Sequence, residues 1–107
     1  MTVSRTLNCA ERSIVRRLLK IVKQNQGEYR RVEWTGQIGA PDLLVGFPRL
    51  QKFFFIETKR PIGGVLTKHQ QKELKFLHEC GIEAFVISNL EELEAFEQRL
   101  TLVTHAV

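Results

Sequence analysis

The stretch GAPDLLVGFPRLQKFFFIETK, residues 39–59, decides the fold of this chain. It holds two apolar segments, and the Gly-Phe-Pro-Arg sequence at 46–49 between them is typical of a turn. The pattern therefore predicts two neighbouring strands, at 43–45 and 52–59. Residues 53–56 are apolar on both faces of the second strand, which indicates a central strand covered on both sides. An aromatic substrate-binding box is the alternative interpretation.

The ends of these two strands carry charged side chains. Side chains alternate between the faces of a strand, so Glu57 and Lys59 point to one face and Thr58 to the other. If the strands pair as a hairpin, the start of one lies beside the end of the other, which brings Asp42 next to Glu57. Desolvating an unpaired charge is costly. Two carboxylates and a lysine at one point therefore predict a divalent-metal site for phosphodiester chemistry.

Length and composition indicate one globular domain, residues 1–107, with 43% hydrophobic and 26% charged residues. No apolar run approaches the roughly 20 residues that span a bilayer. The N-terminus also lacks the apolar segment of a signal peptide. Cys9 and Cys80 fit no zinc or Cys-x-x-Cys spacing, so we expect buried, reduced thiols in a cytoplasmic protein.

The charge of the chain is polarised along its length. The net charge is +4, but residues 1–31 contain eight Lys or Arg against two acids, and residues 79–107 contain six acids against one base. This distribution predicts one face that binds a polyanion. Solvated helix faces alone would give the same pattern, so the charge does not by itself decide the function.

A first helix is expected from Asn8 to about Gln26, with Gly27 as its stop. Glu11 lies in the middle of its apolar stripe, and two interpretations compete. Glu11 either closes a capping box with Asn8 or points toward the sheet as a third carboxylate. The apolar stripe consists of Ile14, Val15, Leu18, Leu19 and Val22, and the opposite side carries Arg12, Arg16, Lys20 and Lys23.

The remaining elements complete an α-β-β-β-α-β-α order, a mixed four-stranded sheet flanked by helices. They are a half-exposed strand at 28–35, a helix from Thr67 to Cys80 stopped by Gly81, a strand from Ile82 to Ser88, a helix from Asn89 to about Leu100, and a frayed tail after Leu102. The helical crossover predicts that the strands at 52–59 and 82–88 are parallel.

The helix that begins at Thr67 carries further polar candidates. Gln70 completes a capping box with Thr67, but it also shares a stripe with Leu74 and Leu77 and could face the site. The connector before the helix lacks a P-loop pattern. The two histidines on this helix lie almost opposite one another and cannot share a metal, which leaves His69 at most as a DNA contact.

The motifs follow one another in a recognisable order: Gly39-x-Pro41-Asp42-Leu43, Glu57-x-Lys59-x-Pro61, a Gly-rich loop, and Thr67-x-x-Gln70. The aspartate and the Glu-x-Lys part resemble the PD-(D/E)xK nuclease superfamily. The whole set resembles the virus-type replication-repair nuclease (VRR-NUC) family, stand-alone phage or bacterial type, over roughly residues 11 to 88. The resemblance implies a restriction-endonuclease-like α/β fold with an extra C-terminal helix.

The resemblance also implies a Mg²⁺- or Mn²⁺-dependent endodeoxyribonuclease that leaves 5′-phosphate and 3′-hydroxyl ends. An oxygen-only ligand set suits these cations. Lys59 would orient or deprotonate the attacking water, and Gln70 would position the water or the scissile phosphate. The implied metal ligands are Glu11, Asp42, Glu57 and the backbone carbonyl of Thr58. The implied DNA-binding residues are Arg12, Arg16, Lys20, Lys23, Arg60, Lys68, Lys72 and Lys75.

Stand-alone members of this family are expected to act as homodimers on branched DNA such as Holliday junctions. Two other functions stay open at this point. One is a nickase, flap or end-processing nuclease. The other is a nucleic-acid-binding module without catalysis, although such a module has no use for carboxylates that face phosphates.

Overall fold

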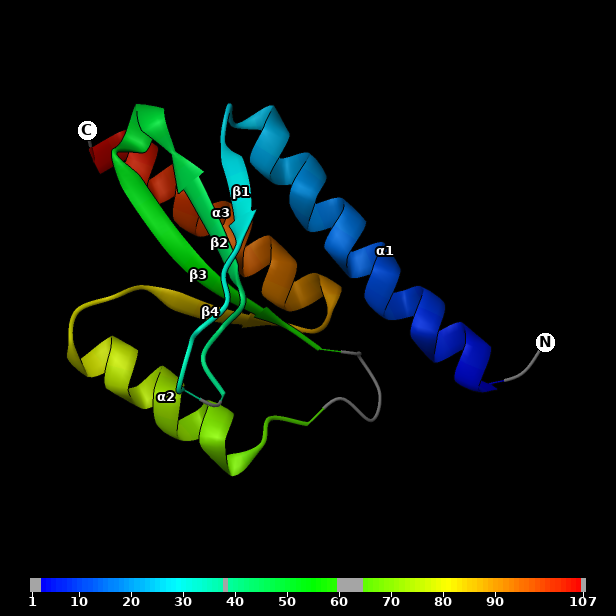
Figure 1. The fold of residues 1–107 in the computed structure, drawn as a ribbon. Coiled ribbons are helices and arrows are strands. Elements are labelled where there is room, and N and C mark those ends of the chain that lie inside the picture. The colour runs from blue at the N-terminus through cyan, green and yellow to red at the C-terminus, as the bar shows by residue number, and fades with distance from the viewer. Residues whose placement is uncertain (1–2, 38, 60–64, 107) are drawn as a thin grey trace.

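The computed structural model describes residues 3–37, 39–59 and 65–106, with side chains described between residues 12 and 102 (Figure 1). The element order confirms the expected α-β-β-β-α-β-α arrangement. The elements are α1 (Val3–Gln24), β1 (Glu28–Arg31), β2 (Leu43–Phe47), the 3₁₀ turn η1 (Pro48–Leu50), β3 (Lys52–Thr58), α2 (Lys68–Glu79), β4 (Ala84–Ile87) and α3 (Leu90–Ala106).

The four strands form one mixed sheet in the order β1-β2-β3-β4. β2 is antiparallel to both β1 and β3, and β4 is parallel to β3, as the helical crossover predicted. In the β2–β3 hairpin Leu43 lies opposite Ile56. One step further along this register, Asp42 falls opposite Glu57. The hairpin expected from the sequence is therefore confirmed.

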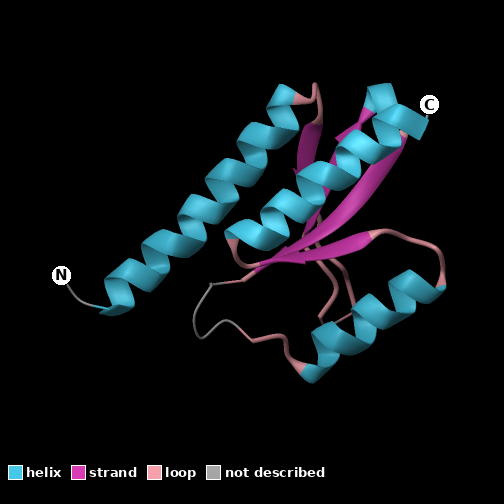
Figure 2. Ribbon diagram, turned by 180° about the vertical axis from the view of Figure 1, so that it is seen from behind, coloured by secondary structure: helices cyan, strands magenta, loops and turns pink. Residues whose placement is uncertain are grey.

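Helices α1 and α3 cover one face of the sheet, and α2 lies on the other (Figures 1 and 2). The larger core lies beneath α1 and α3 and contains aromatic rings at right angles, with the centroids of Phe54 and Phe96 5.6 Å apart. Full burial of one such side chain contributes about 1.5–3 kcal/mol. A smaller core beneath α2 contains Leu74, Leu77 and Ala84. The sheet is thus covered on both sides at its β3–β4 half.

One part of β3 departs from the prediction of a strand covered on both faces. Phe54 and Ile56 are fully buried, but the side chain of Phe53 is 67% exposed. Its ring lies across Gly46, where an added Cβ would come within 2.5 Å of it. Phe53 is exposed because α2 packs against β4 and does not extend over this end of the hairpin (Figure 1).

The first helix begins earlier than expected, at Val3, and ends at Gln24. Asn8 is therefore inside the helix, where it cannot be the N-cap of a capping box with Glu11. The predicted stop at Gly27 is also wrong in detail, because Gln26 is the residue with a positive φ of 59°. Gly27 is required for a close approach instead, since a Cβ there would lie 2.7 Å from the ring of Phe47.

The first strand is shorter than the predicted 28–35 and ends at Arg31. The chain then leaves the ladder, although Val32 N still donates a hydrogen bond of 2.9 Å to the carbonyl of Asp42. The following segment turns toward α2 and does not continue the strand. This departure begins the loop between β1 and β2, residues 32–42, which is called the aspartate loop below.

The C-terminal region differs from expectation in length. Asn89 caps α3 as predicted, with its Oδ1 accepting from Glu92 N at 2.8 Å. The helix continues to Ala106, so the expected end near Leu100 and the frayed tail after Leu102 are both wrong. Leu100 is 1% exposed, because α3 packs against α1 and the sheet.

The second helix ends as predicted. Cys80 is its C-cap, and Gly81 follows with a φ of 81°. Cys80 is exposed, which contradicts the expected burial, because it lies at the C-terminal end of α2, after the last buried residue of the helix, Leu77. The side chain of Cys9 lies outside the described residues. Within the described part of the chain, no helix combines the length and apolarity needed to cross a membrane.

A charge cluster joins β3, β4 and α3 at the end of the sheet that carries Phe53. The carboxylate of Glu83 accepts from Arg99 Nε at 2.7 Å and Nη2 at 3.0 Å, and from Lys52 Nζ at 3.3 Å. The hydrogen bonds from Arg99 lower the pKa of Glu83 by more than partial burial raises it, so this pKa lies below its usual value. The same pairing raises the pKa of Arg99.

Candidate active site

Three contacts in the loop between β1 and β2 hold the backbone of Asp42 next to the start of β2. Trp34 Nε1 donates a 2.6 Å hydrogen bond to the carbonyl of Pro41, which is fully buried. The carbonyl of Asp42 accepts from Val32, as described above. Gly39, with a φ of 87°, lies against the backbone of His69 at the start of α2. The backbone around Asp42 is therefore fixed, while its side chain is exposed to solvent.

The other two predicted groups lie at the end of β3. Lys59 Nζ lies 3.7 Å from Glu57 Oε2, which confirms that the two side chains share one face. Their side chains are only 22% and 13% exposed, so both are largely screened from bulk water. Lys59 N donates a 3.1 Å hydrogen bond to Ile87 O, which ties this strand end to β4.

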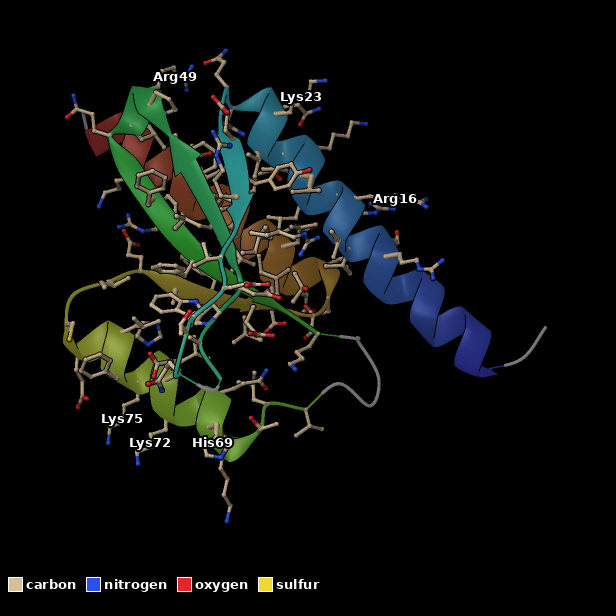
Figure 3. All side chains as sticks on the ribbon, in the orientation of Figure 1. Arg16, Lys23, Arg49, His69, Lys72 and Lys75 are labelled. Atoms are coloured by element: carbon tan, nitrogen blue, oxygen red, sulfur yellow. The ribbon has the colours of Figure 1, made fainter. Side chains whose placement is uncertain are left out.

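Asp42, Glu57, Thr58 and Lys59 line a common cleft of about 710 Å³. The structure therefore brings together the strand-end residues that the sequence singled out. Four further residues complete the lining, and they are Arg12, Val15, Arg16 and Arg31. The cleft lies between α1 and the ends of β2 and β3 (Figure 3).

Arg31 was missed by the sequence analysis. It is the last residue of β1 and pairs in register with Leu43, next to Asp42. The sequence offered no signal for it, because the predicted strand continued to residue 35 and left Arg31 in its interior, whereas β1 ends at Arg31. Only the pairing of β1 with β2 shows that this strand end meets the other two.

The cleft combines two carboxylates with four cationic side chains. Arg12, Arg16 and Arg31 are exposed and line its walls, whereas Glu57 and Lys59 are half-buried. Such a wall attracts an anion, and arginine binds phosphate oxygens in a bidentate manner. Carboxylates would repel that anion unless a cation lay between them. The donor set thus fits a hard divalent cation held against a phosphate.

Glu11 is the third carboxylate that the family resemblance implies. The backbone of Glu11 lies in α1, one residue before Arg12, but its side chain is outside the described residues. Among the side chains that the structure describes, no three His, Cys, Asp or Glu gather in a metal-binding group. The role of Glu11 stays a prediction.

Gln70 makes the capping contacts that the sequence predicted. Its Oε1 accepts from Thr67 N at 2.9 Å, and its backbone N–H donates to Thr67 Oγ1 at 3.1 Å. Gln70 is not among the residues that line the cleft. Its catalytic role stays a prediction.

The predicted DNA-binding residues form two groups on different helices (Figure 3). Arg12 and Arg16 line the cleft itself, although the sequence placed them simply on the side away from the core. Lys20 and Lys23 continue the exposed side of α1. Lys68, Lys72 and Lys75 are exposed on α2. Arg60 lies outside the described residues, as does the connector at 61–64.

The comparisons with known proteins agree with this arrangement. The family model described as the VRR-NUC domain matches residues 2–89. A solved structure titled "VRR_NUC domain" has a TM-score of 0.74 and 25% sequence identity, over 83% of this chain and 95% of that chain. A search of curated proteins found no match. This chain therefore belongs to the VRR-NUC domain family, a family of nuclease-type domains.

Proposed function

We propose that this protein is a divalent-metal-dependent endodeoxyribonuclease that hydrolyses phosphodiester bonds in the cleft between α1 and the strand ends. The observation that carries the proposal is the meeting of Asp42, Glu57 and Lys59 in one cleft whose walls are arginines. A binding module would need the arginines but not the carboxylates, which repel phosphate. Membership of a nuclease-type family supports the same conclusion.

Asp42, Glu57 and the carbonyl of Thr58, with Glu11 from α1, would hold Mg²⁺ or Mn²⁺. When bound, the cation supplies positive charge that activates water and offsets the charge that develops on the phosphate. Lys59 Nζ, 3.7 Å from Glu57 Oε2, would orient the attacking water as an ammonium, or take its proton as an unprotonated amine. Arg12, Arg16 and Arg31 bind the phosphates on either side of the scissile bond.

The cleavage assay compares the wild type with Asp42→Asn, Glu57→Gln and Lys59→Ala on labelled DNA, with Mg²⁺, Mn²⁺ or EDTA. All three variants should lose orders of magnitude in rate. In calorimetry, the two carboxylate variants should also lose metal binding, whereas Lys59→Ala should retain it. Glu94→Gln, an exposed carboxylate on α3, is the matched control and should behave as wild type.

Each contrary result points to a different correction. Normal cleavage by Glu57→Gln would remove this cleft as the active site. Undiminished cleavage in EDTA would exclude the metal-dependent reaction. DNA binding without cleavage under any metal condition would favour the non-catalytic binding module.

Branched DNA such as a Holliday junction is the proposed substrate, and a homodimer is the proposed active form. Basic side chains extend from the cleft along α1 and also along α2, which lies on the other side of the sheet (Figures 2 and 3). Two diverging arms could thus be bound at once. A two-fold dimer would supply two equivalent cleavage sites for a substrate that has the same symmetry.

A substrate panel tests this choice, with four-way junction, flap, nicked and linear DNA cut in parallel. Paired symmetric cuts on junctions, from a protein that sediments as a dimer at micromolar concentration, support it. A monomer that cuts one strand per encounter would favour the nickase, flap or end-processing reaction instead.

A further inference from the structure

A second pocket, of about 390 Å³, lies where the loop between β1 and β2 meets α2. It is lined by Gln37, His69, Lys72, Glu73 and Phe76. The four α2 residues follow the i, i+3, i+4, i+7 spacing of one helix face, so they lie together as a strip. Gln37 reaches the strip from the loop between β1 and β2. This pocket is separate from the cleft that holds Asp42 and Glu57.

The pocket presents an aromatic ring in a basic setting. Phe76 is 57% exposed, although α2 has buried positions for apolar side chains at Leu74 and Leu77. Figure 3 shows His69, Lys72 and Lys75 on the outer side of the same helix. The acidic side chains on this helix are Glu73 and Glu79, which the three lysines outnumber. An exposed ring beside Lys72, with Lys68 and Lys75 exposed elsewhere on the same helix, suits stacking of a nucleobase whose phosphates lie near the lysines.

The carboxylate in the pocket narrows the choice of ligand. Gln37 Nε2 donates a 2.9 Å hydrogen bond to Glu73 Oε2, which orients the carboxylate within the pocket. A carboxylate repels phosphate but accepts hydrogen bonds from the amino and imino groups of bases. The ring and the carboxylate therefore favour a base over a phosphate. A base is available in this way only where the strand is unpaired.

One loop connects this pocket with the catalytic cleft. Gln37 lines the pocket, Asp42 lines the cleft, and Gly39 between them lies against the backbone of His69 and Gln70. At most about 3.6 Å per residue separates the Cα atoms of Gln37 and Asp42, so these two lining residues lie within roughly 18 Å of each other. At about 3.4 Å per nucleotide, this span corresponds to roughly five nucleotides of one strand.

We infer that the pocket on α2 binds an unpaired nucleobase, stacked on Phe76, of the DNA strand that is cut or of its neighbour at a branch point. The inference rests on the proposed nuclease function and deepens it, because it names the feature by which branched DNA is distinguished from duplex. Unpaired bases occur at flaps, at splayed ends and at a junction centre that has opened, and not within an intact duplex.

Binding in EDTA tests the inference without any need for cleavage. Fluorescence anisotropy compares a labelled single strand with the matching duplex, for wild type, Phe76→Ala, Phe76→Leu and Phe76→Trp. Loss of the stacked ring should weaken single-strand binding by roughly 5- to 150-fold in the Ala and Leu variants. The Trp variant should bind as wild type, because it can still stack. Duplex affinity should stay within about twofold in all three.

Phe53→Ala is the matched control, since it removes another exposed ring that lines a different pocket. It should leave both affinities unchanged, and thermal unfolding should confirm that every variant is folded. Wild-type single-strand affinity in Phe76→Ala would overturn the inference and would leave a contact with another protein as the explanation for the exposed ring. Equal losses on single strand and duplex would also overturn it, because they would indicate a phosphate contact.

Parallel cleavage assays separate this inference from the proposed function. A wild type that cuts nothing, with single-strand binding that still depends on Phe76, would reject the nuclease and support the base pocket. Cleavage that depends on Glu57 but shows the same preference for branched DNA in Phe76→Ala would support the nuclease and reject the pocket. If both hold, Phe76→Ala should lose the preference for branched over linear DNA while its cut sites on linear duplex stay unchanged.

Discussion

The substitution Gly39→Ala tests whether the contact between the aspartate loop and α2 positions Asp42. Gly39 has a φ of 87°, and a Cβ there would lie 2.6 Å from His69 C and 2.8 Å from both His69 O and Gln70 N. These are backbone atoms in the first turn of a helix, so they cannot turn aside as a flexible side chain can. The loop would have to move by about 0.8 Å to restore an ordinary contact of 3.4 Å.

Two contributions lower the free energy of unfolding of this variant. A residue with a side chain in the left-handed region costs about 1–2 kcal/mol, and overpacking against fixed atoms typically costs about 1–3 kcal/mol. We therefore expect Gly39→Ala to lower the free energy of unfolding by about 2–5 kcal/mol. Gly36→Ala provides the control, because Gly36 also has a positive φ, 77°, but no atom lies within 4 Å of its added Cβ.

The control should lose only the conformational term, about 1–2 kcal/mol. The effect of replacing glycine on the unfolded chain is similar at both positions and cancels in the comparison. Urea unfolding measures the two losses on the same protein. Cleavage is then measured at a temperature at which both variants are folded. A misplacement of about 1 Å can cost on the order of 100-fold in rate, so Gly39→Ala should lose about 10- to 100-fold and Gly36→Ala only a few-fold.

Two results would refute this reasoning. Equal stability of the Gly39 and Gly36 variants would mean that the close contact with α2 is relieved without cost. A large loss of stability with normal cleavage would mean that the position of Asp42 does not depend on this contact.

Three further predictions concern the cleft, the charge cluster and the core. Arg31→Gln should weaken duplex binding and reduce the slope of log affinity against log salt by about 0.9, measured by anisotropy at several salt concentrations; an unchanged slope would show that Arg31 makes no phosphate contact. Glu83→Gln should lower the free energy of unfolding by about 1 kcal/mol near neutral pH. Because the hydrogen bonds from Arg99 lower the pKa of Glu83, the extra stability of the wild type is present above the unfolded pKa of about 4.5. It is lost as the pH falls through the folded pKa. Unfolding curves at pH 7 and pH 3 check this, and a loss that is the same at both would contradict it. Phe54→Ala should cost about 3–5 kcal/mol in urea unfolding, because its side chain is fully buried. Phe53→Ala should cost less than about 1 kcal/mol, since its ring is 67% exposed; similar losses for both would show that Phe53 is part of the core.

The sequence alone determined the strand-end part of the site, because that part depends on contacts between near neighbours along the chain. Alternation in β3 places Glu57 and Lys59 on one face, and the short hairpin brings Asp42 opposite Glu57. The ends of α2 were predictable for the same reason, since the capping box of Thr67 and the left-handed Gly81 involve residues within a few positions of the helix.

Tertiary structure alone decided which other residues surround these groups. Arg31 reaches the cleft only because β1 pairs with β2, and Arg12 and Arg16 reach it only because α1 crosses near the strand ends. The spacing of apolar residues along the sequence shows which side of α1 faces the core. It does not show the angle at which the helix crosses the sheet, because that angle depends on how the side chains of the two elements pack together.

The same limit explains the exposed aromatic side chains. The sequence around Phe53 has the pattern of a strand covered on both faces. In the structure α2 packs against β4 and leaves Phe53 uncovered. Phe76 is likewise exposed on α2, in a pocket that Gln37 completes from a distant part of the chain. Hydrophobicity in a sequence indicates a preference for burial, but the packing of the whole chain determines which apolar side chains are left for a ligand.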